Sequence, residues 1–267
     1  MTTATFEPGK LDIGRVFSQT FAVLRRNFVA FFGLSFLLTG LPTGIMAFVQ
    51  AGRLPKVSTD PLAAFSPAMI VPTLLAVLVV VVAVSVLQGA LIHGTVQDMN
   101  GNRPSLGDCL ATGLRSFLPL LAVSILFSLA LAGATILLIV PGIMLGCAWC
   151  VVVPALVADR TTIRGAFGRA SDLTRGNRWR IFGLFLIFWV ALFVFAMIAG
   201  ALIVGAALGT GGFDPVSFAT SPLQIGLQTL INAVSYAISS TGVAVLYVEL
   251  RRAREGLGAE GLAGIFS

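Results

Sequence analysis

Charged residues are scarce in this chain of 267 residues: only 10% are Asp, Glu, Lys or Arg, whereas 57% are hydrophobic. Soluble domains carry about a quarter charged residues. The mean hydropathy is high, at +0.98, and no stretch between the apolar runs is long enough to bury a core of its own. The composition therefore excludes a soluble globular protein and predicts a membrane protein.

Residues that usually carry chemistry are also few. His93 is the only histidine, and the sequence lacks the P-loop, zinc-protease and serine-hydrolase motifs. Cys147 and Cys150 lie in an apolar run, where packing is a simpler role than metal binding or redox cycling. An interfacial polar tip is a simpler role for His93 than catalysis. We expect no enzyme activity, no catalytic residue, no metal site and no cofactor.

Six apolar runs approach the length of about 20 residues that a spanning helix needs. Val140-Pro141-Gly142 separates the third run from the fourth, because proline removes a backbone donor and glycine permits a tight reversal. A single kinked helix over both runs would exceed the bilayer thickness about twofold. We predict spans over residues 28–49, 67–92, 117–140, 142–158, 181–208 and 223–248.

Basic residues are concentrated on one side of these spans. With six spans both termini face the same side, and all but two of the 17 Lys and Arg residues fall there; Arg53 and Lys56 are the exceptions. By the positive-inside rule, we expect both termini to be cytoplasmic.

Segments on this basic side are amphipathic. At 100° per residue, Ile163, Ala166 and Phe167 share a face with Ala170 and Thr174. We expect such faces to lie among acyl chains, with the arginines at phosphate level. The predicted interfacial helices cover residues 10–26, 105–115 and 161–175.

The first and last of these segments match at a constant offset, and the middle one fits more loosely. The matched pairs are Ile13 and Ile163, Phe17 and Phe167, Arg25 and Arg175, and Asn27 and Asn177. We interpret the chain, residues 1–267, as one membrane domain of three repeated units, each an amphipathic helix followed by a helical hairpin.

Arginine predominates over lysine, and a guanidinium group can hold a phosphate through two hydrogen bonds. One interpretation is that these arginines only anchor and orient the helices, without a ligand. The more specific interpretation is that arginines from separate units converge on one phosphate-bearing headgroup. The predicted headgroup-binding residues are Arg15, Arg25, Arg26, Arg115, Arg164, Arg169, Arg175, Arg178 and Arg180.

The apolar runs contain a few uncharged polar residues. Gln228, Asn232 and Ser235 share one face of the last span, and Gln88 lies in the second. They form either packing contacts between helices or a polar seam along a lipid groove. The runs hold no charged residue, and Glu249 directly follows the last one. Ion- or proton-coupled carriers usually have a charged residue in mid-membrane.

Residues 151–182, VVVPALVADRTTIRGAFGRASDLTRGNRWRIF, together with the Val-Pro-Gly reversal, resemble the bacterial YciC-type inner-membrane proteins and the related glycerophosphoryl diester phosphodiesterase membrane-domain family. The resemblance is carried by Pro154, Asp159, Ala166, Ser171 and the turn 174–180. It implies a multi-pass protein of the bacterial inner membrane. It supplies no catalytic residue, and no soluble phosphodiesterase domain fits within this chain.

From these patterns we expect an all-α integral membrane protein that is not an enzyme. It would bind anionic phospholipid and act in envelope or lipid homeostasis or as a scaffold. A transporter or channel for a lipid or small molecule is the alternative, and an intramembrane enzyme is the second alternative. A protein partner or homo-oligomer is left open, and no nucleic acid is expected.

Overall fold

The computed structural model describes residues 11–52, 66–137, 139–209 and 221–255. Within these ranges the chain forms helices and no strands. Six stretches are long and apolar enough to cross a membrane: Phe28–Ala51, Pro67–Met99, Leu106–Thr135, Val140–Asp159, Arg178–Phe195 and Pro222–Glu255. The prediction of an all-α, multi-pass membrane protein is confirmed.

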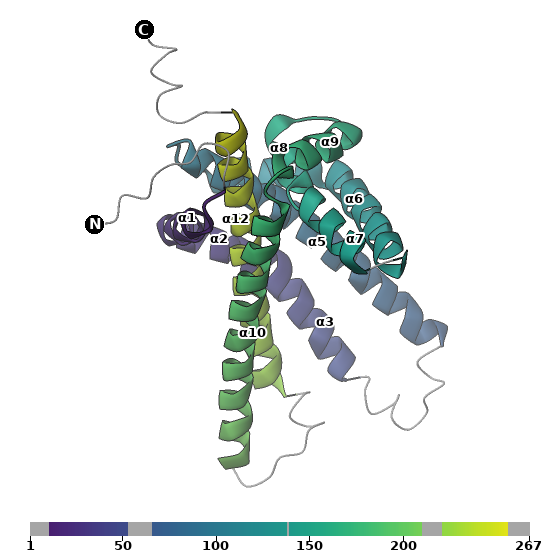
Figure 1. Ribbon diagram of the computed structural model, residues 1–267. Helices are drawn as coiled ribbons and strands as arrows, with labels where there is room; N and C mark the ends of the chain where they lie inside the picture. Colours follow the sequence, from purple (N-terminus) through teal and green to yellow (C-terminus); the bar gives the residue numbers. More distant parts are fainter. Residues whose placement is uncertain (1–10, 53–65, 138, 210–220, 256–267) are drawn as a thin grey trace, which may run out of the picture.

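Two short helices, α1 (Ile13–Arg26) and α9 (Ile163–Thr174), lie across one end of the long helices (Figure 1). The first span consists of α2 (Phe28–Ser35), the π-helical turn η1 (Phe36–Gly40) and α3 (Leu41–Ala51). The remaining helices are α5 (Pro67–Met99), α6 (Leu106–Leu137), α7 (Ile139–Trp149), α8 (Val152–Asp159), α10 (Arg178–Gly209) and α12 (Pro222–Glu255).

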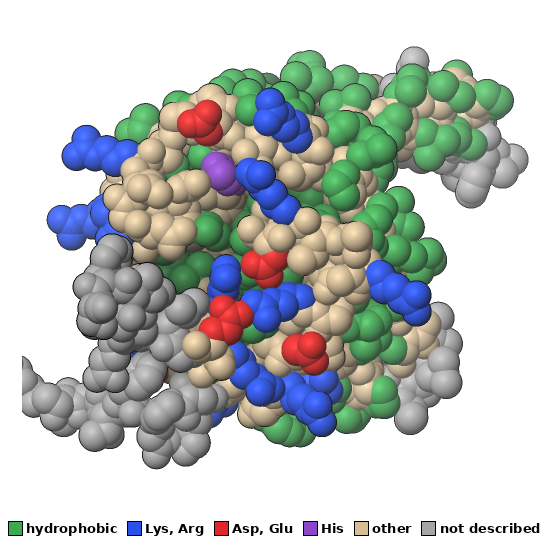
Figure 2. All heavy atoms as spheres, turned by 90° about the horizontal axis from the view of Figure 1, so that it is seen from above, with side chains coloured by type: hydrophobic (Ala, Val, Ile, Leu, Met, Phe, Trp, Pro, Cys, Tyr) green, Lys and Arg blue, Asp and Glu red, His purple; other side chains and the backbone are tan. Residues whose placement is uncertain are grey.

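The end that carries α1 and α9 is called the basic end here. Described arginines lie in or beside α1 and α9, near the α5–α6 connection and at the end of α12, and Figure 2 looks down on this face. Arg53, Lys56 and the predicted helix start at Lys10 lie outside the described residues.

The middle amphipathic segment, 105–115, is not a separate interfacial helix as predicted, because it forms the first turns of α6. Small residues explain the difference. A Cβ on Gly113 would lie 2.3 Å from the carbonyl oxygen of Val86, and one on Gly94 would lie 3.1 Å from Cys109 Sγ. These contacts pack the segment closely against α5, so α6 continues without a break.

The predicted reversal at Val140–Gly142 is displaced. These residues lie in the first turn of α7, which begins at Ile139, after α6 has ended at Leu137. Pro141 is tolerated there because the first N–H groups of a helix have no partner within it. Gly142 instead serves packing, since a Cβ on it would lie 2.6 Å from Thr135 Oγ1.

The apolar faces of α1 and α9 are buried inside the protein, which corrects the expectation that they lie among acyl chains. Val16 and Val23 of α1 and Ala166 and Ala170 of α9 are at most 2% exposed and belong to the main hydrophobic core. Leu250 of α12 belongs to the same core. Because bilayer and protein interior are both apolar, the sequence pattern alone does not distinguish them.

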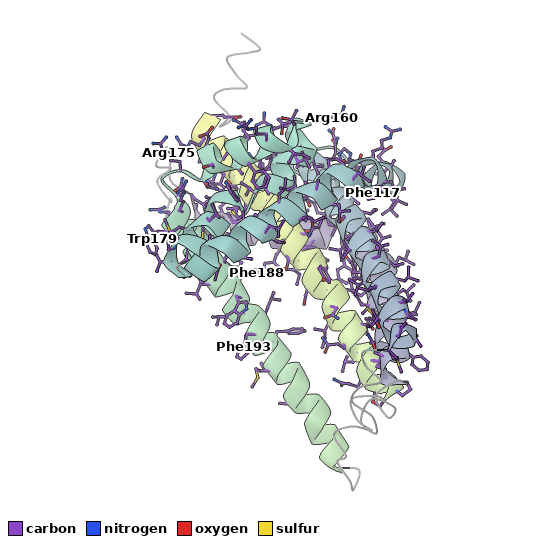
Figure 3. The ribbon with its side chains drawn as sticks, turned by 90° about the vertical axis from the view of Figure 1, so that its right-hand side faces the viewer. Phe117, Arg160, Arg175, Trp179, Phe188 and Phe193 are labelled. Carbon is purple, nitrogen blue, oxygen red and sulfur yellow. The ribbon has the colours of Figure 1, made fainter. Side chains whose placement is uncertain are left out.

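Away from the basic end the helices separate. α10 stands apart from the α5–α6–α12 group over much of its length (Figure 3). Its large side chains are exposed at successive positions, including Phe193, Val194 and Phe195. A helix with apolar side chains exposed all round suits contact with lipid.

Candidate headgroup-binding surface and polar cavity

The two crossing helices begin in the same way. Asp12 accepts a hydrogen bond from the backbone N–H of Arg15, and Thr162 accepts one from that of Gly165, so both helices carry an N-terminal side-chain cap. α1 begins at Ile13 and α9 at Ile163, which are matched positions of the predicted repeat. The middle segment, being part of α6, lacks this arrangement.

The entry to α1 is bonded to the turn that follows α9. The backbone N–H of Leu11 donates to Asn177 Oδ1 at 3.2 Å, and Arg180 Nη1 donates to the carbonyl oxygen of Leu11 at 2.9 Å. Arg254 of α12 donates to the carbonyl oxygen of Arg175 at 2.8 Å. These bonds fix the α9–α10 turn between α1 and the end of α12.

Asp98 at the end of α5 pairs with α1. It accepts from Arg26 Nε at 3.2 Å and Arg26 Nη2 at 2.5 Å, and also from Asn27 Nδ2 at 2.8 Å. The hydrogen bond to Asp98 raises the pKa of the Arg26 guanidinium above its ordinary value, so Arg26 stays charged at physiological pH. The two paired residues lie 72 positions apart in the sequence.

Asp159 is the centre of a second polar cluster. It accepts hydrogen bonds from Tyr247 Oη at 2.7 Å, Arg169 Nε at 3.2 Å and Arg251 Nη1 at 3.4 Å. Glu255 binds both arginines, with Arg251 Nε at 2.7 Å. The bond to Glu255, followed by those to Asp159, raises the pKa of Arg169 despite its partial burial. This cluster joins α8, α9 and α12.

Glu249 is the most buried described carboxylate at this end, with 6% exposure. It lies 3.0 Å from Arg252 Nη1 and 3.7 Å from Arg15 Nη1. A buried charge of this kind requires such partners. Glu249 thereby links α12 to α1.

The structure divides the predicted headgroup-binding arginines into two groups. Arg15, Arg26 and Arg169 bind carboxylates within the protein. Arg180 donates to the Leu11 carbonyl, and half-buried Arg178 lies 3.5 Å from Ser171 Oγ. The remaining ones are exposed, and their side chains bind no carboxylate of the described residues: Arg25, Arg115, Arg164 and Arg175.

These exposed arginines are distributed around the basic end instead of converging. Figure 2 shows basic side chains beside acidic ones in the middle of this face and others at its margin. Arg25 lies in α1, Arg115 in α6 and Arg164 in α9. Arg175 follows the end of α9, and Figure 3 shows it well apart from Arg160, which precedes the start of that helix. Several separate anions are therefore better accommodated here than one shared headgroup.

Arg25 lies at an apolar groove of about 370 Å³ between α1, α2 and α12. Phe21, Leu24 and Phe28 line it beside Arg25, and Ala237 lines it from α12. Phe21 and Phe28 are more than half exposed. A basic group next to an apolar groove at the end of a membrane helix is complementary to a phosphate attached to an acyl chain.

A second cavity, of about 440 Å³, lies between α5, α8 and α12 and is the polar cavity below. It contains Asn232 and Ser235 of the predicted polar seam, whereas Gln228 donates to Asn232 Oδ1 at 3.1 Å within the same helix. Its polar lining residues are Gln88, Asn232, Ser235, Tyr236, Ser239 and Ser240.

Sequence reasoning did not assign roles to Tyr247, Glu249 or Asp98 in binding the helices together. Their signal was a polar group at the end of an apolar run, which does not identify a partner.

His93 is half-buried in α5, and the three cysteines are free. No cluster of three or more potential metal-ligating His, Cys, Asp or Glu side chains occurs among the described residues.

Comparison with protein-family models, with curated proteins and with solved structures gives no match to this chain.

Proposed function

We propose that this protein is a non-enzymatic protein of the bacterial inner membrane that binds anionic phospholipid at its basic end, which would face the cytoplasm. The supporting observation is Arg25, an exposed guanidinium group beside an apolar groove lined by Phe21 and Phe28. The phosphate would bind the guanidinium group, and part of an acyl chain would lie in the groove.

Arg115, Arg164 and Arg175 would provide further headgroup contacts. Near an anionic leaflet each such side chain contributes about 1 kcal/mol. Trp179, four residues after Arg175, is 70% exposed at the start of α10. Its ring would lie at the membrane interface. Bound lipid would support a role in envelope or lipid homeostasis or in presenting lipid to a protein partner.

The proposal includes a repeat of the first and last units, since the middle segment is part of α6, and the relationship to YciC-type proteins. The matched starts of α1 and α9 support the repeat for two units. The resemblance over residues 140–182 supports the relationship, with α8 ending at Asp159 and α9 carrying Ala166 and Ser171.

Native mass spectrometry tests headgroup binding. The protein is released from nanodiscs that contain equal amounts of phosphatidylglycerol and phosphatidylcholine, and the retained lipids are counted. Replacing Arg25 by Gln should weaken phosphatidylglycerol retention about fivefold, as expected for about 1 kcal/mol. Replacing Arg25, Arg164 and Arg175 together should reduce it further.

Arg169→Gln is the matched control, because it removes the same charge from a residue that binds Asp159 and Glu255. It should leave lipid retention unchanged. Equal retention by the wild type and the triple variant would refute the proposal, as would an equal loss in the control.

A further inference from the structure

Three serine hydroxyl groups of α12 line the polar cavity: Ser235, Ser239 and Ser240. Thr39, Ser85 and Thr229 each donate to the backbone carbonyl four residues earlier, at 2.7–2.8 Å. Ser235 and Ser239 make no such bond to any described residue, and Ser240 Oγ is buried without a partner. Hydroxyl groups that bond to their own backbone need nothing more, whereas these retain open hydrogen-bonding positions.

The amides of the cavity have open positions as well. Gln88 on α5 binds no described residue, and Asn232 uses its Oδ1 atom to accept from Gln228. In the hydrocarbon region an unsatisfied polar group costs several kcal/mol. A ligand that hydrogen-bonds to both helices would remove this cost.

The lining indicates that the polar part of such a ligand is uncharged. The residues that line the cavity include no Asp, Glu, Lys, Arg or His. A phosphate or an ammonium group placed there would lose its hydration without gaining an ionic partner. Amide and hydroxyl side chains can donate to and accept from neutral hydroxyl and ester groups.

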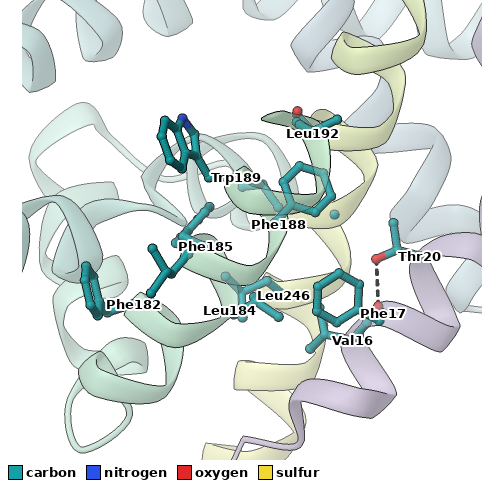
Figure 4. A pocket seen from close by; sticks show the side chains of 14 residues that line it. Val16, Phe17, Thr20, Phe182, Leu184, Phe185, Phe188, Trp189, Leu192 and Leu246 are labelled. Carbon is teal, nitrogen blue, oxygen red and sulfur yellow. Dashed lines mark hydrogen bonds between the residues drawn. The ribbon is translucent and has the colours of Figure 1, made fainter. Parts of the chain in front are cut away.

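An apolar groove adjoins this cavity. It has a volume of about 460 Å³, lies between α1, α10 and α12, and shares the lining residues Ser239 and Val243 with the polar cavity. Phe185, Phe188 and Trp189 of α10 line it (Figure 4). Trp189 and Leu186, which line this groove, are 63% and 49% exposed, so a chain can enter it from the lipid side.

We propose that the two spaces together bind an uncharged glycerolipid of the diacylglycerol class. Its hydroxyl and ester oxygens would hydrogen-bond to Gln88, Asn232 and Ser235, and an acyl chain would lie along α10. This site is separate from the groove at Arg25 and does not depend on the proposed binding of anionic headgroups.

Quenching of Trp189 fluorescence by brominated lipid tests the proposal. The full-length protein carries Trp149→Phe and Trp179→Phe, so that Trp189 is the only tryptophan, and is placed in phosphatidylcholine nanodiscs. Brominated diacylglycerol is compared with brominated phosphatidylcholine of the same chains. We expect half-maximal quenching at a mole fraction at least fivefold lower for diacylglycerol.

Variants then locate the site. Gln88→Leu combined with Asn232→Leu should raise the half-maximal mole fraction of diacylglycerol roughly five- to tenfold, as expected for two hydrogen bonds within a membrane. The matched control, Ser124→Ala with Ser128→Ala on α6, and the variant Arg25→Gln should have no effect. Equal quenching by the two lipids, or an unchanged preference in the Gln88/Asn232 variant, would overturn the proposal.

Cys150 provides a measurement that leaves the polar residues intact. It lines the cavity and, with Cys109→Ala and Cys147→Ala, is the only thiol. Diacylglycerol should slow its alkylation by a small maleimide at least threefold, and extra phosphatidylcholine should not. Alkylation at the same rate with and without diacylglycerol would show that the lipid does not occupy the cavity and would overturn the proposal.

Discussion

The hydroxyl group of Tyr247 donates to a carboxylate oxygen of Asp159 at 2.7 Å, joining residues that lie 88 positions apart. Tyr247 is only 1% exposed and belongs to the hydrophobic core. This bond connects the end of α8 to α12 through the same carboxylate that pairs with Arg169 and Arg251. It therefore helps to hold α8 against α12 at the basic end, where Arg169 and Arg251 bind the same carboxylate.

Tyr247→Phe should lower the free energy of unfolding by about 2 kcal/mol, because a buried hydrogen bond to a charged group is lost while the ring still fills its site. Thermal unfolding in detergent, followed by loss of monodisperse protein, measures the change. Tyr236→Phe, on a more exposed tyrosine of α12, is the control and should change stability little. Equal melting temperatures for Tyr247→Phe and wild type would contradict a structural role of this bond.

Gly113→Ala should destabilise the α5–α6 pair by about 1–3 kcal/mol, because the added methyl group would collide with the carbonyl oxygen of Val86. Gly107→Ala on the same helix meets nothing within 4 Å. It should leave stability unchanged or raise it by up to about 1 kcal/mol through helix propensity. Equal stability of the two variants in thermal unfolding would contradict the close contact between α5 and α6 at Gly113.

The Arg26–Asp98 pair should show a coupling free energy of about 1 kcal/mol in a double-mutant cycle of Arg26→Gln and Asp98→Asn. The value is modest because Arg26 is about half exposed to solvent. Part of it should disappear in 1 M salt, since screening weakens exposed charge pairs. Additive effects of the two substitutions would show that the pair is energetically unimportant.

Filling the groove at Arg25 should weaken lipid binding without changing any charge. Val234 lines this groove, so the larger side chain of Val234→Trp would displace part of the acyl chain. Phosphatidylglycerol retention should fall roughly two- to fivefold, because the lost binding free energy would be similar to that of about one buried methylene group. Val29→Trp, at a side chain 84% exposed, is the control and should leave retention unchanged. Native mass spectrometry measures both, and equal retention in Val234→Trp would show that the acyl chain does not use this groove.

Much of the architecture follows from local sequence. The number of spans and the amphipathic faces of α1 and α9 were predicted, because both depend on the composition and periodicity of short segments. Gln228, Asn232 and Ser235 were predicted to share a polar face, and two of them, Asn232 and Ser235, line the polar cavity. The continuation of α6 through 105–115 was missed, since Gly113 packs against Val86 only once the two helices are antiparallel neighbours.

The sequence by itself determined that this chain must fold into apolar helices with arginines gathered at one end. Tertiary structure decided which arginines form ion pairs within the protein. Arg26 pairs with Asp98, 72 residues away, and Arg251 pairs with Asp159, 92 residues away. It also decided that the faces of α1 and α9 contact protein and that Gln88 shares a cavity with Asn232. Periodicity shows which side of a helix is apolar, but only the packing of distant segments determines what covers it.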